Sequence, residues 1–289
     1  MIHSMEAIHS KTHIGLVSLT VANFGRSLPF YTRNIGLKLL SQNGNEAILG
    51  TAERPLLHLV EQPGATVPRS TTGLYHFALL VPSRVELAKT FKNLVETETE
   101  FQGFSDHSVS EAIYLGDPDG NGIEIYRDRP RDEWPVQNGR LQMDTLPLDL
   151  QGLVEELQGR PTQWQGLHAG TVMGHIHLHV RNLDEAEDFY CNVLGFERVM
   201  RYGTAAGFVS AGGYHHHIGL NTWAGAGAPP PPADAAGLRY YEVLLPNQSA
   251  LDQVLARLNA NEVAYQAEAE GVLVQDPSLN KILLKVETA

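Results

Sequence analysis

Apolar and polar residues alternate along the chain in a short pattern that recurs. A β-rich run opens each occurrence, and a stretch such as residues 183–194 follows with apolar positions at helical spacing. Three short runs typical of strands come next, separated by turn residues; residues 111–115, the Asp-Pro turn at 117–122 and residues 123–126 are one example. The pattern predicts a βαβββ unit.

Comparison of the chain with itself indicates that this unit is duplicated. Residues 15–37 match residues 174–196, a displacement of 159 positions (174 minus 15). Residues 73–82 match residues 237–246, a displacement of 164 positions (237 minus 73). Each half of the chain therefore contains two related units.

We accordingly predict an α+β fold of four βαβββ modules in two tandem halves, in which paired modules form cup-shaped mixed sheets with the helices outside. Prolines break the pattern between the halves, where a linker is expected to contain one short helix. The expected boundaries are 1–135 for the first half (modules at about 13–62 and 73–128), 136–170 for the linker, and 171–289 for the second half (modules at about 174–224 and 237–287).

Composition narrows the class of partner. The chain has 289 residues, of which 43% are hydrophobic and 19% charged, enough to bury a substantial core. A formal charge of −12 without clustered Lys and Arg argues against nucleic acid. No stretch approaches the roughly 18 apolar residues of a membrane span, and the N-terminus has no signal-like start. We expect a cytoplasmic protein that binds a small molecule and no membrane; a homodimer is one arrangement compatible with the sequence.

A single cysteine, Cys191, excludes an intrachain disulfide and argues against a thiolate metal cage. It follows the aromatic pair Phe189-Tyr190 in a helical stretch. A buried, unreactive thiol is the expected outcome.

The histidines supply the candidate chemistry. His175, His177 and His179 alternate with apolar residues, so they project from one face of a strand. His76 has the same parity in the strand of the second module, and Glu124 interrupts an otherwise apolar last strand of that module. A histidine taken alone is more often a hydrogen-bonded interior residue, and a lone glutamate often faces solvent. The three residues His76, Glu124 and His175 taken together favour a metal site.

The other two modules act as an internal control. At the corresponding positions they carry Leu16, Tyr240 and Leu283, so they lack this polar set. Two imidazoles and one carboxylate favour a borderline divalent ion and leave coordination positions open, which suits non-haem Fe(II).

On these residues the chain resembles the vicinal oxygen chelate superfamily, the group of glyoxalases, bleomycin resistance proteins and extradiol dioxygenases, and within it the two-domain catechol 2,3-dioxygenase-like proteins. The resemblance covers nearly all of both halves. Its most specific segments are 74–77, 105–111, 117–126, 174–177 and 214–221. It implies an extradiol ring-cleaving dioxygenase of aromatic catabolism that acts on a catechol-like diol with O2. Its cofactor would be Fe(II), with Mn(II) or another divalent metal as the alternative.

The resemblance also implies roles for individual residues. His175 would be the first histidine ligand, with His76 and Glu124 as the other two. His216 would act on substrate or bound oxygen and Tyr114 would bind a substrate oxygen, with His107 and His217 as neighbouring candidates; the alternation does not decide which of the consecutive histidines 215–217 faces the site.

One departure from the family pattern makes a geometric prediction. The usual pattern draws all three ligands from the C-terminal half, which Tyr240 and Leu283 prevent here. The second module must therefore pair with the third. If the halves closed separately instead, His13 or His58 would have to complete a first-half site.

Two alternatives to a dioxygenase stay open at this point. Another metal enzyme of the superfamily, a glyoxalase-like isomerase or a hydrolase, would differ in its metal and would not consume oxygen with catechols. A metal-free protein that binds small molecules would hold no divalent ion and would keep its ligand when His76 or Glu124 is replaced.

Overall fold

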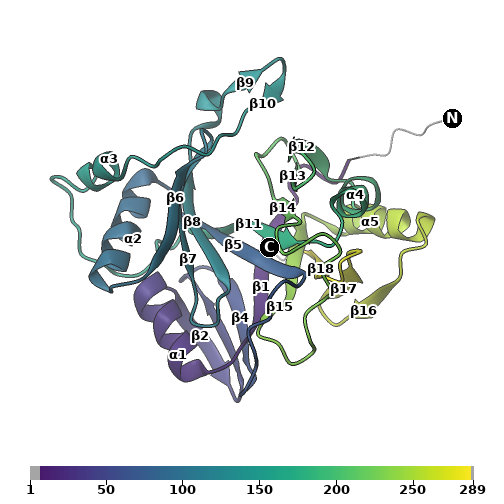
Figure 1. The fold of residues 1–289 in the computed structure, drawn as a ribbon, viewed down its shortest axis with the longest axis horizontal. Coiled ribbons are helices and arrows are strands. Elements are labelled where there is room, and N and C mark those ends of the chain that lie inside the picture. Colours follow the sequence, from purple (N-terminus) through teal and green to yellow (C-terminus); the bar gives the residue numbers. More distant parts are fainter. Residues whose placement is uncertain (1–6, 288–289) are drawn as a thin grey trace. The chain divides into compact units, whose positions relative to one another are not determined.

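The computed structural model describes residues 7–287 and has a mixed α+β fold (Figure 1). The first eight-stranded sheet has the order β16 (Tyr265–Glu268), β17 (Gly271–Gln275), β18 (Lys281–Val286), β15 (Gly237–Leu245), β1 (His13–Val21), β4 (Pro55–Glu61), β3 (Glu46–Gly50) and β2 (Lys38–Asn43). The second has the order β12 (Glu197–Tyr202), β13 (Ala206–Ser210), β14 (Ile218–Asn221), β11 (Val172–His179), β5 (Gly73–Leu80), β8 (Gly122–Asp128), β7 (Ser110–Gly116) and β6 (Phe101–Asp106).

The helices complete four βαβββ modules, so the predicted fold class is confirmed. They are α1 (Phe24–Pro29), continued by the π-helix η1 (Phe30–Ile35), α2 (Arg84–Glu96), α4 (Leu183–Asp188), continued by the π-helix η3 (Phe189–Val193), and α5 (Gln248–Ala260). In strand order β5 is the neighbour of β11, so the second and third modules belong to one sheet, while the first and fourth belong to the other.

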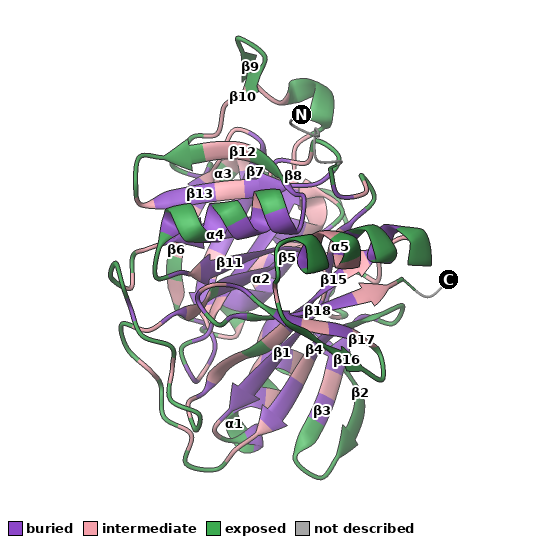
Figure 2. Cartoon of the chain, turned by 90° about the vertical axis from the view of Figure 1, so that its right-hand side faces the viewer, coloured by how far each residue is buried: buried purple, intermediate pink, exposed green. Residues whose placement is uncertain are grey.

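The helices form where the sequence supplies both a cap and an apolar side. Asn247 caps α5 by accepting a hydrogen bond from the backbone N–H of Ala250, and Ser83 caps α2 in the same way through Glu86. The inner positions of α5 are buried whereas its outer side is exposed (Figure 2). Burial of this apolar side, rather than helix propensity, accounts for most of the helix's stability.

A hairpin and a short helix occupy the predicted linker region, 136–170. They are the hairpin of β9 (Val136–Gln137) and β10 (Arg140–Leu141), and α3 (Leu150–Glu155); the short 3-10 helix η2 (Arg131–Glu133) precedes the predicted linker. Asn138 and Gly139 both have positive φ, as a two-residue hairpin turn requires. Within residues 7–287 no helix is long and apolar enough to cross a membrane.

Contacts between Cα atoms divide the chain into two compact units. One unit contains residues up to 18, residues 68–75 and residues from 175 onward, and the other contains residues 19–67 and 76–174. The division passes through β1, β5 and β11, so each of these strands contributes residues to both units. The boundaries of the tandem halves stay a prediction from the sequence.

The Asp-Pro turn before the last strand of a module is fixed by a buried carboxylate. Oδ1 of Asp117 accepts the backbone N–H groups of Asp119 and Asn121 at 2.9 and 2.8 Å, and Oδ2 accepts the Tyr31 hydroxyl at 2.8 Å. Burial raises the pKa of the Asp117 carboxyl, although the hydrogen bonds oppose this shift. The turn sets where β8, and with it Glu124, begins.

The same turn recurs in the fourth module. Oδ1 of Asp276 accepts from the backbone of Ser278 and Asn280 at 2.8 and 2.9 Å, and Oδ2 accepts the Tyr190 hydroxyl at 3.1 Å. The repeat in sequence is therefore also a repeat in hydrogen bonding.

Candidate metal centre

His76 and Glu124 come from neighbouring parallel strands. In the register of β5 and β8, His76 lies opposite Gly122 and Ala78 lies opposite Glu124. Since alternate residues of a strand share a face, both side chains project to the same side. Nε2 of His76 and Oε2 of Glu124 are 3.1 Å apart, and the residues are only 6% and 3% exposed.

An apolar cluster holds this pair from the same face. Ala78, Ala112 and Tyr126 are fully buried there, and Tyr114 packs against them. The ring of Tyr114 lies 5.7 Å from that of His76. The histidine face is therefore partly apolar, which limits the rotamers open to the two polar side chains.

His175 lies on β11, whose opposite face is apolar. Ile176 and Leu178 pair with Ile218 and Leu220 of β14, and all four are fully buried. His175 itself is 1% exposed.

The close packing of β11 explains why a glycine, Gly174, precedes His175. A Cβ at Gly174 would collide with the phenol of Tyr126. Glycine thus allows β11 to pass close to a ring of the apolar cluster that supports His76 and Glu124.

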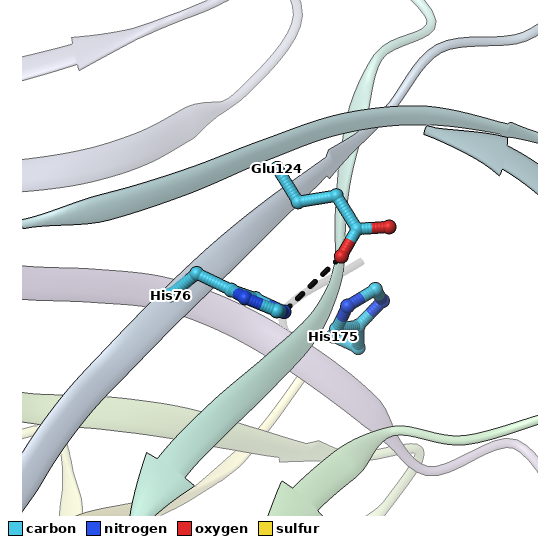
Figure 3. A group of neighbouring side chains, drawn as sticks. All are labelled: His76, Glu124 and His175. Carbon is cyan, nitrogen blue, oxygen red and sulfur yellow. Dashed lines mark ion pairs between the residues drawn. The ribbon is translucent and has the colours of Figure 1, made fainter. Parts of the chain in front are cut away.

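The structure brings the three predicted ligands together. The nearest ligand atoms of His76, Glu124 and His175 all lie within 4.8 Å of one another, and all three residues are buried (Figure 3). Nε2 of His76 and Oε2 of Glu124, 3.1 Å apart, are close enough to bind one ion together. The donor set also fits, because two imidazoles and a carboxylate on one face are typical of non-haem Fe(II) sites.

Of the three consecutive histidines, His216 is the one whose ring lies against His175. The ring centroids are 4.1 Å apart, whereas that of His215 is 6.4 Å from His175. Nδ1 of His215 and Nδ1 of His216 are 2.9 Å apart, so one ring donates to the other. His217 is held differently: its Nδ1 accepts the backbone N–H of Ala211 at 3.1 Å.

His107 and Tyr114, two of the catalytic candidates from the sequence, are joined by a hydrogen bond. Nε2 of His107 and the Tyr114 hydroxyl are 2.8 Å apart, and Nδ1 of His107 is 2.7 Å from the carbonyl oxygen of Asp144. A carbonyl oxygen can only accept, so Nδ1 donates to it. In a neutral ring Nε2 then accepts, and the Tyr114 hydroxyl donates. The contact of Asp144 with His107 could not be predicted from the sequence, because Asp144 lies in the linker, outside any repeat.

The alternative ligands His13 and His58 lie on strands of the first sheet, β1 and β4. Their rings face Glu287 at 3.6 Å and Glu46 at 3.5 Å. Within residues 7–287 the group of side chains that could hold a metal ion consists of His76, Glu124 and His175, and includes neither of these two histidines.

In the first sheet, other residues stand at the positions equivalent to those around the candidate metal centre. Glu242, at the position of Ala78, accepts the backbone N–H of Leu16 at 3.1 Å and pairs with Lys285 at 3.3 Å. Leu283, at the position of Glu124, is 7% exposed. An internal ion pair thus occupies the polar face of this sheet.

The family assignment rests on a sequence match to both halves. The family model of the Glyoxalase/Bleomycin resistance protein/Dioxygenase superfamily matches residues 13–125 and 172–276. The chain belongs to this superfamily. A Bacillus subtilis (strain 168) protein named catechol-2,3-dioxygenase is 48% identical over 279 residues, which covers 94% of this chain and 96% of that protein.

Solved structures agree on the superfamily fold at low sequence identity. A candidate dioxygenase from Bacillus subtilis subsp. subtilis str. 168 has a TM-score of 0.64 at 13% identity, covering 99% of this chain and 87% of its own. Glyoxalase I from Zea mays has a TM-score of 0.59 at 14% identity, covering 96% of this chain and 92% of its own. Because these proteins are similar in fold and differ in described activity, the fold does not choose between activities.

Proposed function

We propose that the chain is a divalent-metal-dependent, extradiol-type ring-cleaving dioxygenase that acts on a catechol-like diol with O2. The observation that carries the proposal is the convergence of His76, Glu124 and His175 from three strands. The relative named catechol-2,3-dioxygenase supports it, because nearly all of both chains align at 48% identity.

His76, Glu124 and His175 would hold the ion, with Fe(II) as the first choice and Mn(II) or another divalent metal as the alternative. Bound there, the ion would act as a Lewis acid toward two adjacent substrate oxygens and leave room for O2. Because the three side chains are buried, they would shield a bound ion from solvent water on the side that they line.

Tyr114 and His107 would move a proton of the diol. The Tyr114 hydroxyl donates to Nε2 of His107, so its oxygen has lone pairs available for a substrate hydroxyl. As the diol loses a proton to the Tyr114 oxygen, the phenolic proton passes to Nε2 of His107. The resulting imidazolium stays hydrogen-bonded to the Asp144 carbonyl through Nδ1.

We assign His216 the role of a second general acid or base, separate from the Tyr114–His107 pair. Its ring lies against that of the candidate ligand His175, so it would be close to a diol held at this site. A positioned imidazole of this kind typically contributes about 100-fold or more to rate.

Oxygen uptake tests the proposal. Protein purified under argon and supplied with Fe(II) is given a panel of catechols while oxygen consumption and the absorbance of the ring-opened product are followed. We expect stoichiometric uptake with at least one catechol. A protein that binds Fe(II) without consuming oxygen with any of them would favour an isomerase or hydrolase of the superfamily instead.

A further inference from the structure

A row of rings extends from His175 along the same face of β11. His216 contacts His175, and Phe208 lies 5.0 Å from His216, measured between ring centroids. His177, two residues beyond His175, is 5.6 Å from Phe208 and 5.5 Å from Trp223. The contacts are therefore continuous from the candidate metal centre to Trp223.

Tyr75 closes the outer end of this row. Its ring lies 5.1 Å from those of both His177 and Trp223, nearly perpendicular to each. We call Tyr75, His177, Phe208 and Trp223 the aromatic wall.

The aromatic wall is buried at one end and open at the other. His177 is 4% exposed, whereas Tyr75 is 39% and Trp223 is 54% exposed. Large aromatic side chains left this exposed beside a candidate active site offer ring surface to a ligand.

Hydrogen bonds fix the backbone that carries Trp223. Oδ1 of Asn221 accepts the backbone N–H of Trp223 at 3.0 Å and lies 2.7 Å from Nδ1 of His179. An amide oxygen carries no hydrogen, so Nδ1 of His179 donates to it. Asn221 is fully buried, so this end of the wall is held in place before any ligand arrives.

The distance along β11 matches a substituent on the diol ring. Residues two apart in a strand are separated by roughly 6.6 Å, so His177 lies about that far beyond His175 on the same face. A second ring joined to the diol ring by a single bond would reach the wall.

We propose that the aromatic wall binds a planar aromatic substituent of the diol, so that the enzyme prefers aryl-substituted catechols to catechol itself. This inference rests on the proposed function, because the candidate metal centre positions the diol. Trp223 is the specificity-determining residue, since its ring is the most exposed of the wall.

Binding calorimetry under argon, on protein supplied with Fe(II), tests the inference without turnover. The probes are 4-phenylcatechol and catechol, and the variants are Trp223→Ala, Trp223→Phe and Trp134→Ala. Trp134 is a matched control, because it is a tryptophan that is not part of the aromatic wall: its indole donates to the Arg129 carbonyl at 2.9 Å, and Arg131 lies over its ring.

We expect the wild type to bind 4-phenylcatechol about 10-fold more tightly than catechol, which corresponds to about 1.4 kcal/mol. Trp223→Ala should remove this preference and leave the Kd of catechol unchanged. Trp223→Phe should keep most of it, and Trp134→Ala all of it.

Two outcomes separate the inference from the proposed function. If catechol binds and Trp223→Ala leaves the Kd of 4-phenylcatechol unchanged, or weakens both ligands equally, the aromatic wall is not a substituent site. If neither diol binds to the Fe(II)-supplied wild type, the proposed function fails first, and the inference fails with it.

Discussion

At the scale of single residues, the hydrogen bonds of His107 determine the direction in which the Tyr114 hydroxyl donates. Asp144 offers only a carbonyl oxygen to His107, which fixes the tautomer of a neutral His107 ring and hence the direction of the Tyr114 hydroxyl. A linker residue thus orients the phenol of Tyr114, which lies on β7 directly opposite the candidate ligand Glu124 of β8. The proton route proposed for Tyr114 depends on this fixed direction.

Replacement of Tyr114 by Phe tests that route. We expect kcat to fall about 100-fold, the usual effect of losing a positioned acid or base. The iron content should be unchanged, because Tyr114 is not among the grouped ligands. The control is Tyr240→Phe, which alters a tyrosine of the other sheet. Equal losses of kcat in both variants would mean that the phenol of Tyr114 has no special role.

Cys191 illustrates the opposite case, a residue whose environment suppresses chemistry. Burial raises the pKa of the thiol to about 11, and the neighbouring Arg198 only partly opposes the shift. The neutral thiol is favoured in the folded state, so its contribution to stability is full below the ordinary pKa and is lost as pH rises toward 11.

Alkylation measures this directly. The rate at which iodoacetamide modifies Cys191 in the folded protein should still be rising between pH 9 and 10, with a midpoint near pH 11. The same measurement in denaturant should give a midpoint near the ordinary value of about 8.5. A folded-state midpoint at that ordinary value would contradict the account.

At the scale of elements, the Asp-Pro turns position the last strands. Asp117 uses both carboxylate oxygens, one for backbone N–H groups and the other for the Tyr31 hydroxyl and the Asn121 amide. Asn at this position would retain one acceptor oxygen and turn an NH2 group toward the other donors.

Asp117→Asn should therefore lower the free energy of unfolding by about 1–3 kcal/mol at pH 7, as expected for a buried donor left without an acceptor. Urea denaturation provides the measurement. The loss should grow at acidic pH: because the pKa of this carboxyl is raised in the native state, the native wild type binds the proton more readily than the unfolded chain and gains stability as pH falls, whereas the Asn variant has no such group. A variant as stable as the wild type at pH 7 would show that the turn does not depend on the carboxylate.

Gly174 and Gly15 occupy equivalent positions in the repeat but pack against different side chains. Gly174 passes against the Tyr126 phenol, while Gly15, 159 positions earlier (174 minus 15), passes against the side chains of Glu242 and Leu244. We expect Gly174→Ala to displace β11 or Tyr126 and to weaken Fe(II) binding at least 10-fold.

Gly15→Ala is the matched control, because it should destabilise the fold by about 1–3 kcal/mol without changing Fe(II) affinity. Calorimetric titration of Fe(II) under argon compares the two. Equal Fe(II) affinities would mean that the approach of β11 to Tyr126 has no bearing on the ligands.

At the scale of the whole molecule, duplication explains what the sequence could and could not predict. The repeat, together with helix and strand periodicity, predicted the four modules and the pairing of the second with the third, because Tyr240 and Leu283 left no other way to assemble the ligands. Contacts between segments that do not belong to a repeat could not be predicted in this way. The Asp144–His107 bond and the approach of Trp223 to His177 depend on the paths of the linker and of a loop, which periodicity does not encode.

Iron content is the most direct measure of the central claim that His76, Glu124 and His175 share one ion. The wild type, His76→Ala, His175→Ala and the control His58→Gln are purified under argon, supplied with Fe(II), desalted and analysed for metal. We predict about one iron per chain for the wild type and the control, and less than about a tenth of that for the two ligand variants. Full iron content in either folded ligand variant, or loss of iron from His58→Gln alone, would contradict the assignment.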